Sequence, residues 1–342
     1  MKRAMLYDVQ KLRLEEAETP VPEAHQVLVE VWACGICGSD LHIFEGDHPA
    51  IRPPAVMGHE FCGRVAAVGA AVRQFAPGDV VAGIPGVGCG NCDYCREGNR
   101  NRCRSLKVIG GHLPGAFAEY VIVPEDNLVS VPEGFSPVEG AMIESTAVAV
   151  HSVHRMGEIA GKTFLVLGAG PIGNLTIQVL KAYGARAVIA SDPAEYRRVL
   201  AKRVGADVVI DPVNEDLEAR IRQALPGEDG VDGAFDCAGL QLTLHQALTV
   251  TKNGGKVVIT AVFGKDPTIP MNLVQRGERE IIGTQQYLKS DFDVAVRLMA
   301  EKKVQVTDMV TRSYPLDRIE EAFQAAVSRS GGDGKIVIVM KG

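Results

Sequence analysis

The sequence lacks the features that would direct a protein to a membrane or to nucleic acid. It contains no run of about 18 apolar residues, the length that a helix needs to cross a bilayer. Lys2 and Arg3 are followed by no long apolar run, so we expect no signal peptide. The net charge is -6 without a long run of one sign, which argues against nucleic acid or an anionic membrane as the main partner. We therefore expect a cytoplasmic protein.

Internal repeats and low-complexity segments are also absent from the sequence. Its 342 residues are enough for two domains, each able to bury its own core. Hydrophobic residues make up 46% and charged residues 23% of the chain, which is ordinary for a globular protein. We therefore expect two globular domains.

Cysteine is plentiful by contrast, and its spacing is informative. In a chain of this length without an export signal, clustered cysteines are more typical of metal ligands than of disulfides. Cys89, Cys92, Cys95 and Cys103 follow the pattern C-x2-C-x2-C-x7-C. Four thiolates in one loop can enclose a tetrahedral zinc ion with no open position, which makes a structural site. An iron–sulfur cluster is a minor alternative, and unliganded thiols are another.

A second candidate metal site is encoded at residues 34–42 and 58–60, where the sequence reads CGICGSDLH and GHE. Cys37, His59 and Glu60 offer a thiolate, an imidazole and a carboxylate. Three protein ligands leave the fourth position of a zinc ion open, as in catalytic sites. We predict a glycine-rich loop for the first stretch, and strands for the segments around it at 27–32, 63–69 and 79–83.

The second half of the chain has a different pattern. Short apolar runs alternate with helical segments, which indicates a doubly wound parallel sheet. One more strand, at 335–340, follows a turn at 328–334, and the sequence does not decide which domain this strand joins. The predicted strands of the parallel sheet span residues 163–167, 187–191, 208–210, 233–237, 256–260 and 281–283.

The first predicted strand of this half leads into a dinucleotide-binding pattern. Gly168, Gly170 and Gly173 form G-x-G-x-x-G between a strand and a helix, and the pyrophosphate of a dinucleotide binds at such a helix N-terminus. Asp192 ends the next strand, where its carboxylate can accept hydrogen bonds from the adenosine ribose. This negative charge favours NAD over NADP, whereas the nearby Arg197 could accommodate a 2′-phosphate. NADP therefore stays open as the alternative cofactor.

In this order, the motifs resemble the zinc-dependent medium-chain dehydrogenase/reductase family, and within it the sorbitol dehydrogenase-like polyol and sugar-acid dehydrogenases. The resemblance covers essentially the whole chain and also includes GAFAEY at 115–120 and VGAD at 204–207. It implies an α/β protein that forms a homo-oligomer, either a dimer or a tetramer. The implied parts are a GroES-like β-rich catalytic domain at 1–148, a Rossmann NAD-binding domain at 149–288, and a C-terminal segment at 289–342 that returns to the catalytic domain.

The resemblance also implies the ligands of two zinc ions per chain, one structural and one catalytic. Cys37 and His59 match ligands of the catalytic zinc. Glu60 is expected as the direct third ligand, with Glu144 in contact with it, directly or through the zinc-bound water. The structural zinc would be held by the four clustered cysteines, Cys89, Cys92, Cys95 and Cys103.

Further roles follow from the same resemblance. Ser39 and His42 match a relay that carries the proton of the substrate hydroxyl to solvent, and Asp40 is expected to orient His59. The residues expected at the cofactor are Gly168, Gly170, Pro171, Ile172, Gly173, Asp192, Arg197, Val262 and Gln285.

The implied reaction is the oxidation of a secondary alcohol of a polyol or sugar acid to a ketone, with NAD as the oxidant. The polar sequence GTQQY at 283–287 suits a substrate with several hydroxyl groups. Oxidation of L-threonine or butanediol on the same scaffold is the alternative within the family. A zinc hydrolase is the alternative of another class, because a glutamate beside a zinc-binding histidine can act as a general base. The dinucleotide pattern argues against it, since hydrolysis needs no dinucleotide.

Overall fold

The structure, a computed structural model, describes residues 1–328 and 334–340. It divides into two compact units. The first consists of Met1–Glu144, Leu288–Val296 and Met309–Gly342, and the second of Ser145–Tyr287 and Arg297–Asp308. The C-terminal segment expected at 289–342 is thus shared between the two units. Of the turn predicted at 328–334, residues 329–333 lie outside the described residues.

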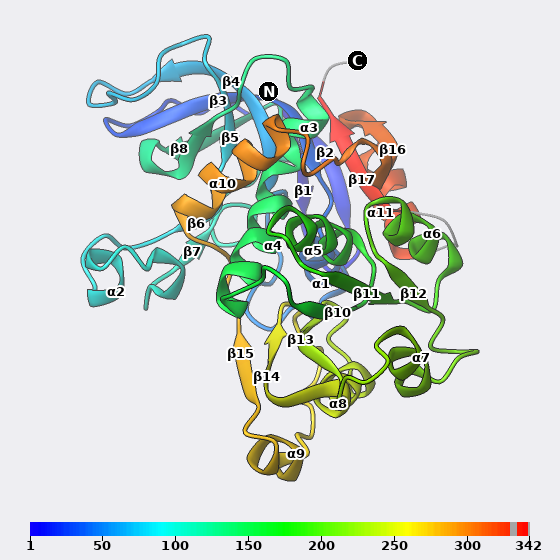
Figure 1. The fold of residues 1–342 in the computed structure, drawn as a ribbon. Helices are drawn as coiled ribbons and strands as arrows, with labels where there is room; N and C mark the ends of the chain where they lie inside the picture. The colour runs from blue at the N-terminus through cyan, green and yellow to red at the C-terminus, as the bar shows by residue number, and fades with distance from the viewer. Residues whose placement is uncertain (329–333, 341–342) are drawn as a thin grey trace. The chain divides into compact units, whose positions relative to one another are not determined.

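The first unit is built mainly from strands. Its largest sheet has seven strands in the order β16-β17-β3-β4-β5-β9, with β8 paired to β3. The last strand, β17 (Lys335–Val339), pairs antiparallel with β3 (Gln26–Gly35) and parallel with β16 (Val310–Pro315), beside which it is drawn in red in Figure 1. The end of the chain therefore completes the sheet that begins near its start, a pairing that the sequence left open.

Short strands and helices surround this sheet. Its remaining strands are β4 (Glu60–Val68), β5 (Val80–Gly83), β8 (Tyr120–Pro124) and β9 (Leu128–Ser130). Two smaller sheets pair β1 (Lys2–Leu6) with β2 (Leu12–Glu16), and β6 (Gly86–Val87) with β7 (Lys107–Val108). The helices and 3-10 turns of this unit are α1 (Gly38–Glu45), α2 (Asp93–Arg96), η1 (Arg100–Arg102), η2 (Glu125–Asn127), α3 (Pro137–Ala141), η4 (Leu316–Arg318) and α11 (Ile319–Ser328).

Helix α1 corrects the prediction of a glycine-rich loop after Cys37. Cys37 is the N-cap of this helix, and the side chain of Asp40 accepts a hydrogen bond from its backbone N–H at 2.9 Å. Gly46 ends the helix in the left-handed conformation, with φ of 84°, which a glycine adopts without steric cost. The sequence did not indicate this helix because it has only eight residues, begins with a glycine and is followed by another, Gly46.

The second unit contains the predicted parallel sheet. Its six strands are ordered β12-β11-β10-β13-β14-β15, the arrangement of a doubly wound dinucleotide-binding fold. Every residue of β10 is buried, as expected for a strand covered on both faces. The α/β prediction is therefore confirmed. The strands are β10 (Thr163–Leu167), β11 (Ala187–Ser191), β12 (Val208–Ile210), β13 (Val231–Asp236), β14 (Thr251–Ile259) and β15 (Glu280–Gly283).

Helices connect these parallel strands. Helix α5 (Pro171–Ala182) follows β10 directly, and its first residue is a proline, which fits the first turn because no N–H is needed there. The other helices of the unit are α6 (Glu195–Arg203), α7 (Leu217–Ala224), α8 (Gln241–Val250) and α9 (Met271–Arg276). Three elements cross the boundary between the units, namely α4 (Ile143–Met156), α10 (Lys289–Ala300) and η3 (Thr307–Met309). Within the described residues, no helix has both the length and the apolar character needed to cross a membrane.

Candidate functional site

The first candidate metal centre lies where α1 and β4 begin. Single ligand atoms of Cys37, His59 and Glu60 all lie within 4.8 Å of one another, although the residues come from two separate stretches of the chain. Glu60 is 1% exposed, so its charge requires a partner. A thiolate, an imidazole and a carboxylate at this spacing fit a zinc ion with one position left for a substrate.

Asp40 organises this group from within α1. It is fully buried, and its Oδ1 lies 3.4 Å from Nδ1 of His59. An imidazole that donates its Nδ1–H to a carboxylate keeps Nε2 available for a metal. Burial works to lower the pKa of His59, but the charge and hydrogen bond of Asp40, together with Cys37, raise it well above its usual value. The negative groups beside His59 therefore favour a positive charge at this position, which a zinc ion would also supply.

Lys335 is the residue that the sequence reasoning missed. It begins the last strand, is 4% exposed, and forms an ion pair with Oε2 of Glu60. Burial would lower the pKa of Lys335, but the negative charges of Glu60, Cys37 and Glu144 raise it. The one signal for Lys335 in the sequence was that a single charged residue begins an otherwise apolar strand. Only the pairing of β17 with β3 brings that charge to the metal residues.

A glycine makes this ion pair possible. Gly35 ends β3, and a Cβ placed on it would lie 2.8 Å from Cε of Lys335 and would also collide with Oε2 of Glu60. No larger residue fits without displacing one of the charged groups. The buried lysine and glutamate therefore fill the space that the missing side chain leaves.

Glu144 lies at the start of α4 and is 6% exposed. It is not a member of the close group formed by Cys37, His59 and Glu60. Its charge nevertheless raises the pKa of Lys335, which shows that it lies within electrostatic reach of the same buried site. Whether Glu144 contacts Glu60 remains a prediction.

The two expected relay residues lie on α1, three positions apart and therefore on one face of the helix. Oγ of Ser39 lies 3.5 Å from Nε2 of His59, on the side where a metal would bind. His42 has a partly exposed side chain, and its Nδ1 lies 2.9 Å from Oδ1 of Asp47. Asp47 can thus hold the His42 tautomer whose Nε2 accepts a proton.

The four clustered cysteines form a second candidate metal centre. The sulfur atoms of Cys89, Cys92, Cys95 and Cys103 lie within 4.8 Å of one another, and all four are free thiols. Hydrogen bonds from the backbone N–H groups of Cys95 and Arg104 lower the pKa of Cys92 to about 6. Burial raises the pKa of Cys95 to about 11. This donor set has no water-binding position and fits a structural zinc.

The glycine loop of the second unit has the geometry of a phosphate cradle. Gly168 has φ of 89°, and a Cβ on Gly173 would collide with its carbonyl oxygen. Gly170 is the N-cap of α5, and a Cβ placed on it would meet no atom within 4 Å. The N-terminus of α5 is therefore bare backbone, which suits the pyrophosphate of a dinucleotide.

Asp192 ties this loop to the end of β11. It is 1% exposed, and its carboxylate accepts hydrogen bonds from the backbone N–H of Ala169 at 2.9 Å and of Ala194 at 2.8 Å. Arg197 lies 3.5 Å from the same carboxylate and stacks over the ring of Tyr196 at 5.5 Å. Asp192, which is expected to favour NAD, and Arg197, which could accommodate the 2′-phosphate of NADP, thus lie side by side. The other residues expected at the cofactor include Val262 and Gln285, which are exposed.

Comparison with known proteins gives matches in both halves of the chain. The model of the alcohol dehydrogenase GroES-like domain matches residues 23–133, and the model of the zinc-binding dehydrogenases matches residues 171–301. The chain is 37% identical to L-threonine 3-dehydrogenase of Pyrococcus furiosus over 96% of its length and 95% of that protein. It is 32% identical to sorbitol dehydrogenase of Bacillus subtilis over 96% of its length and 94% of that protein.

A solved structure is similar over the whole chain. The zinc-binding dehydrogenase of Sinorhizobium meliloti bound to NADP aligns with a TM-score of 0.92 and 36% identity, over 99% of this chain and 98% of that one. The likeness thus extends across both units and is not confined to one motif. The chain therefore belongs to the zinc-dependent medium-chain dehydrogenase/reductase family.

Proposed function

We propose that the protein oxidises a secondary alcohol of a polyol or sugar acid to a ketone, using one catalytic zinc and NAD. The observation that carries the proposal is the close group of Cys37, His59 and Glu60, of which Glu60 is buried, with the hydroxyl of Ser39 beside it. A zinc ion held there would act as a Lewis acid on the substrate hydroxyl and lower its pKa. NAD held by the glycine loop would supply the oxidising nicotinamide.

The chain's own residues would remove the proton. Ser39 can accept the proton of the substrate hydroxyl, because its oxygen lies beside the nitrogen of His59 that faces the metal position. His42 follows on the same helical face, and its partly exposed ring can pass the proton to solvent. Asp47 would stabilise the charged imidazole while it holds the proton. Glu60 and Lys335 would form a buried ion pair without net charge, and this pair would hold the Glu60 ligand in place.

We propose NAD as the cofactor because Asp192 places a negative charge where a 2′-phosphate would bind. NADP is the second candidate, since Arg197 lies beside that carboxylate and the similar dehydrogenase from S. meliloti is described as bound to NADP. Oxidation of L-threonine is a second candidate reaction, because the relative from P. furiosus is 37% identical.

The test is the formation of NADH or NADPH by the zinc-loaded protein with polyols, aldonic acids, L-threonine, 2,3-butanediol and simple alcohols. We expect activity with NAD on compounds that carry several hydroxyl groups. A preference for L-threonine would favour the second candidate, and no reduced cofactor from any compound would contradict a dehydrogenase function. The relay is tested by Ser39→Ala, for which we expect kcat to fall about 100-fold at neutral pH, as for other general acid–base groups.

A further inference from the structure

Two segments of the first unit pack together beside the candidate catalytic metal residues. A Cβ on Gly111 would collide with the side chain of Ile51, so the segment at 108–113 lies directly on the segment at 48–52. A Cβ on Gly110 would lie 2.7 Å from the carbonyl oxygen of Gly58, the residue before His59. The two segments are therefore anchored to the backbone that carries a predicted metal ligand.

Both segments carry basic side chains near the point where they pack together. Nδ1 of His48 accepts hydrogen bonds from the backbone N–H groups of Ala50 at 3.2 Å and Ile51 at 3.0 Å. The guanidinium of Arg52 donates to the carbonyl oxygen of His48, which closes the turn. His112 follows Gly111 and is exposed. One turn thus holds His48 and Arg52 together, and the other carries His112, whose charge reaches His48.

His48 is held in one protonation state. Because its Nδ1 already accepts two backbone N–H groups, the ring carries its proton on Nε2 and presents a donor. Burial lowers the pKa of His48, and the charges of His42, Arg52 and His112 lower it further. His42, Arg52 and His112 therefore each lie within electrostatic reach of His48. Arg52 contributes a permanent positive charge, and His48 contributes a neutral N–H donor.

The nearby carboxylates do not neutralise Arg52. Across the residues that the structure describes, no carboxylate lies within ion-pair distance of Arg52 or His112. Asp47 is paired with His42, and Asp40 is buried and hydrogen-bonded to Cys37. A carboxylate oxygen of Glu45 lies within 4.8 Å of the ligand atoms of His42 and Asp47. Glu45 precedes the turn in the sequence, whereas Arg52 follows it. Apart from its hydrogen bond to the carbonyl oxygen of His48, the Arg52 guanidinium therefore keeps donors that no carboxylate among the described residues occupies.

We propose that Arg52, His48 and His112 form a subsite for a carboxylate, so that the substrate is a hydroxy acid and not a neutral polyol. This inference rests on the proposed dehydrogenase function and narrows its substrate class. A guanidinium with its planar set of donors matches a carboxylate with two hydrogen bonds. One permanent charge balances a monoanion, whereas a phosphate ester at neutral pH carries nearly two negative charges.

The experiment compares matched pairs that differ in one group: D-gluconate with D-sorbitol, galactonate with galactitol, and L-threonine with L-threoninol. We measure kcat/KM for each member with the wild-type protein and with Arg52→Gln and Arg52→Lys. For the pair that reacts, we expect the acid to exceed its neutral partner at least tenfold. Arg52→Gln should lower this ratio about tenfold or more, mainly through KM, and Arg52→Lys should lower it less.

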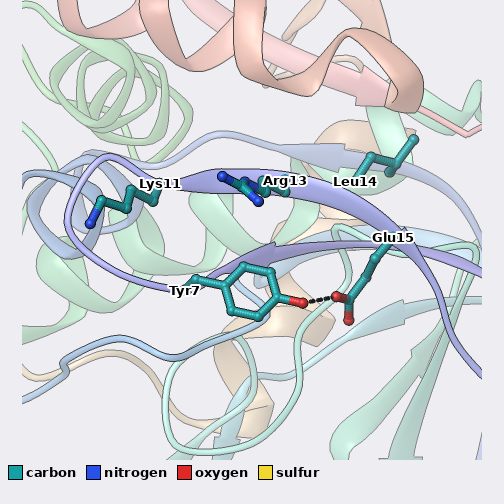
Figure 2. Close-up of a pocket in the computed structure, with 5 residues that line it drawn as sticks. All are labelled: Tyr7, Lys11, Arg13, Leu14 and Glu15. Carbon is teal, nitrogen blue, oxygen red and sulfur yellow. Dashed lines mark hydrogen bonds between the residues drawn. The ribbon is translucent and has the colours of Figure 1, made fainter.

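Arg13→Gln is the matched control. Arg13 is an exposed arginine of β2 and lies on the same strand as Leu14 and Glu15 (Figure 2). This variant removes the same charge without touching the subsite and should leave the ratio unchanged. Raising the ionic strength should reduce the ratio of the wild-type protein, since Arg52 is exposed to screening.

Three outcomes would overturn the subsite. They are a preference for the neutral member of the reacting pair, an unchanged ratio in Arg52→Gln, and a tenfold preference for galactitol 1-phosphate over every acid. If no pair gives reduced cofactor, the dehydrogenase function fails first. Calorimetric binding to the zinc-loaded protein with NADH then decides the subsite, which stands only if gluconate binds more tightly than sorbitol and Arg52→Gln removes the difference.

Discussion

The two candidate metal centres of the first unit are assembled in opposite ways. The cysteine centre takes all its ligands from residues 89–103, a single loop. The other centre joins Cys37, His59 and Glu60, and its counter-charge, Lys335, comes from the last strand of the chain. A local loop can bind its metal with little help from the rest of the fold, whereas the composite centre exists only when the sheet is complete.

The two centres also differ in the chemistry of their ligands. Four thiolates saturate a zinc ion and leave it no open position, so the cysteine centre can only stabilise. Three mixed ligands leave one position, and the buried side chains of Asp40 and Lys335 place charged groups beside the centre. We therefore expect substitutions in the composite centre to abolish turnover and substitutions in the cysteine loop to lower stability.

The largest effect should follow from Cys37→Ser. Loss of the thiolate ligand should reduce zinc from two ions to one per chain and remove a Lewis acid that supplies several kcal/mol of the rate enhancement. We expect kcat/KM to fall roughly a thousandfold or more, while the unfolding temperature changes little. Zinc analysis, steady-state kinetics and circular dichroism on one preparation check this. Full activity in a one-zinc protein would contradict it.

Lys335→Met should come next, because it leaves Glu60 buried without its cationic partner. Breaking a buried ion pair costs about 3–5 kcal/mol, so we expect an unfolding temperature lower by roughly 10 °C. Zinc at Cys37, His59 and Glu60 would offset part of this loss, so the effect should be larger in the metal-free protein. Lys335→Arg is the control that keeps the charge. An equal decrease of the unfolding temperature with and without zinc would show that Lys335 does not act together with the metal centre.

Cys95→Ser should have a smaller effect, and on stability alone. Loss of one thiolate should release the zinc of the cysteine loop and lower the unfolding temperature by about 5 °C, since the metal no longer cross-links the folded loop. Turnover at low temperature should stay within about threefold of the wild-type value, because the composite centre keeps its metal. Thermal unfolding and activity at 10 °C distinguish the two effects. Immediate loss of turnover would show that the two centres depend on each other.

The smallest effect is a pH dependence in protein stripped of zinc. The pKa of the Cys92 thiol is lowered to about 6, so the thiolate is favoured in the folded loop. Its contribution to stability is complete above the ordinary pKa of a thiol and is lost as the pH falls through about 6. Alkylation of Cys92 by iodoacetamide should therefore persist to about pH 6, whereas that of Cys95, with a pKa of about 11, should not. Mass spectrometry of the labelled peptides at each pH shows whether Cys92 still reacts at a pH where Cys95 does not.

The comparison also shows what a sequence can predict here. The strands at 163–167, 187–191 and 208–210 were predicted with the observed bounds, because each is a short apolar run closed by polar residues. The cysteine loop was recognisable because its sulfur atoms must be close whatever the rest of the chain does. Both signals are local, so they need no knowledge of the fold.

The parts that could not be predicted depend on pairing between distant segments. Lys335 reads as an ordinary charge at the start of a strand until β17 pairs with β3. Helix α1 is short, and the hydrogen bond from Cys37 to Asp40 that begins it involves the same aspartate that contacts His59. The carboxylate subsite likewise appears only when residues 108–113 pack on residues 48–52.

The contact of Gly110 with Gly58 has a consequence for protein engineering. Gly58 has φ of 94°, its carbonyl oxygen accepts a hydrogen bond from Ala116 at 2.8 Å, and Gly110 and Gly115 both lack the side chain that would push it away. A loop graft intended to change substrate preference cannot move residues 108–113 without shifting the backbone next to His59. Segments 48–58 and 108–116 therefore form one exchangeable cassette, and chimaeras that transfer only one of them should lose activity before they gain a new specificity.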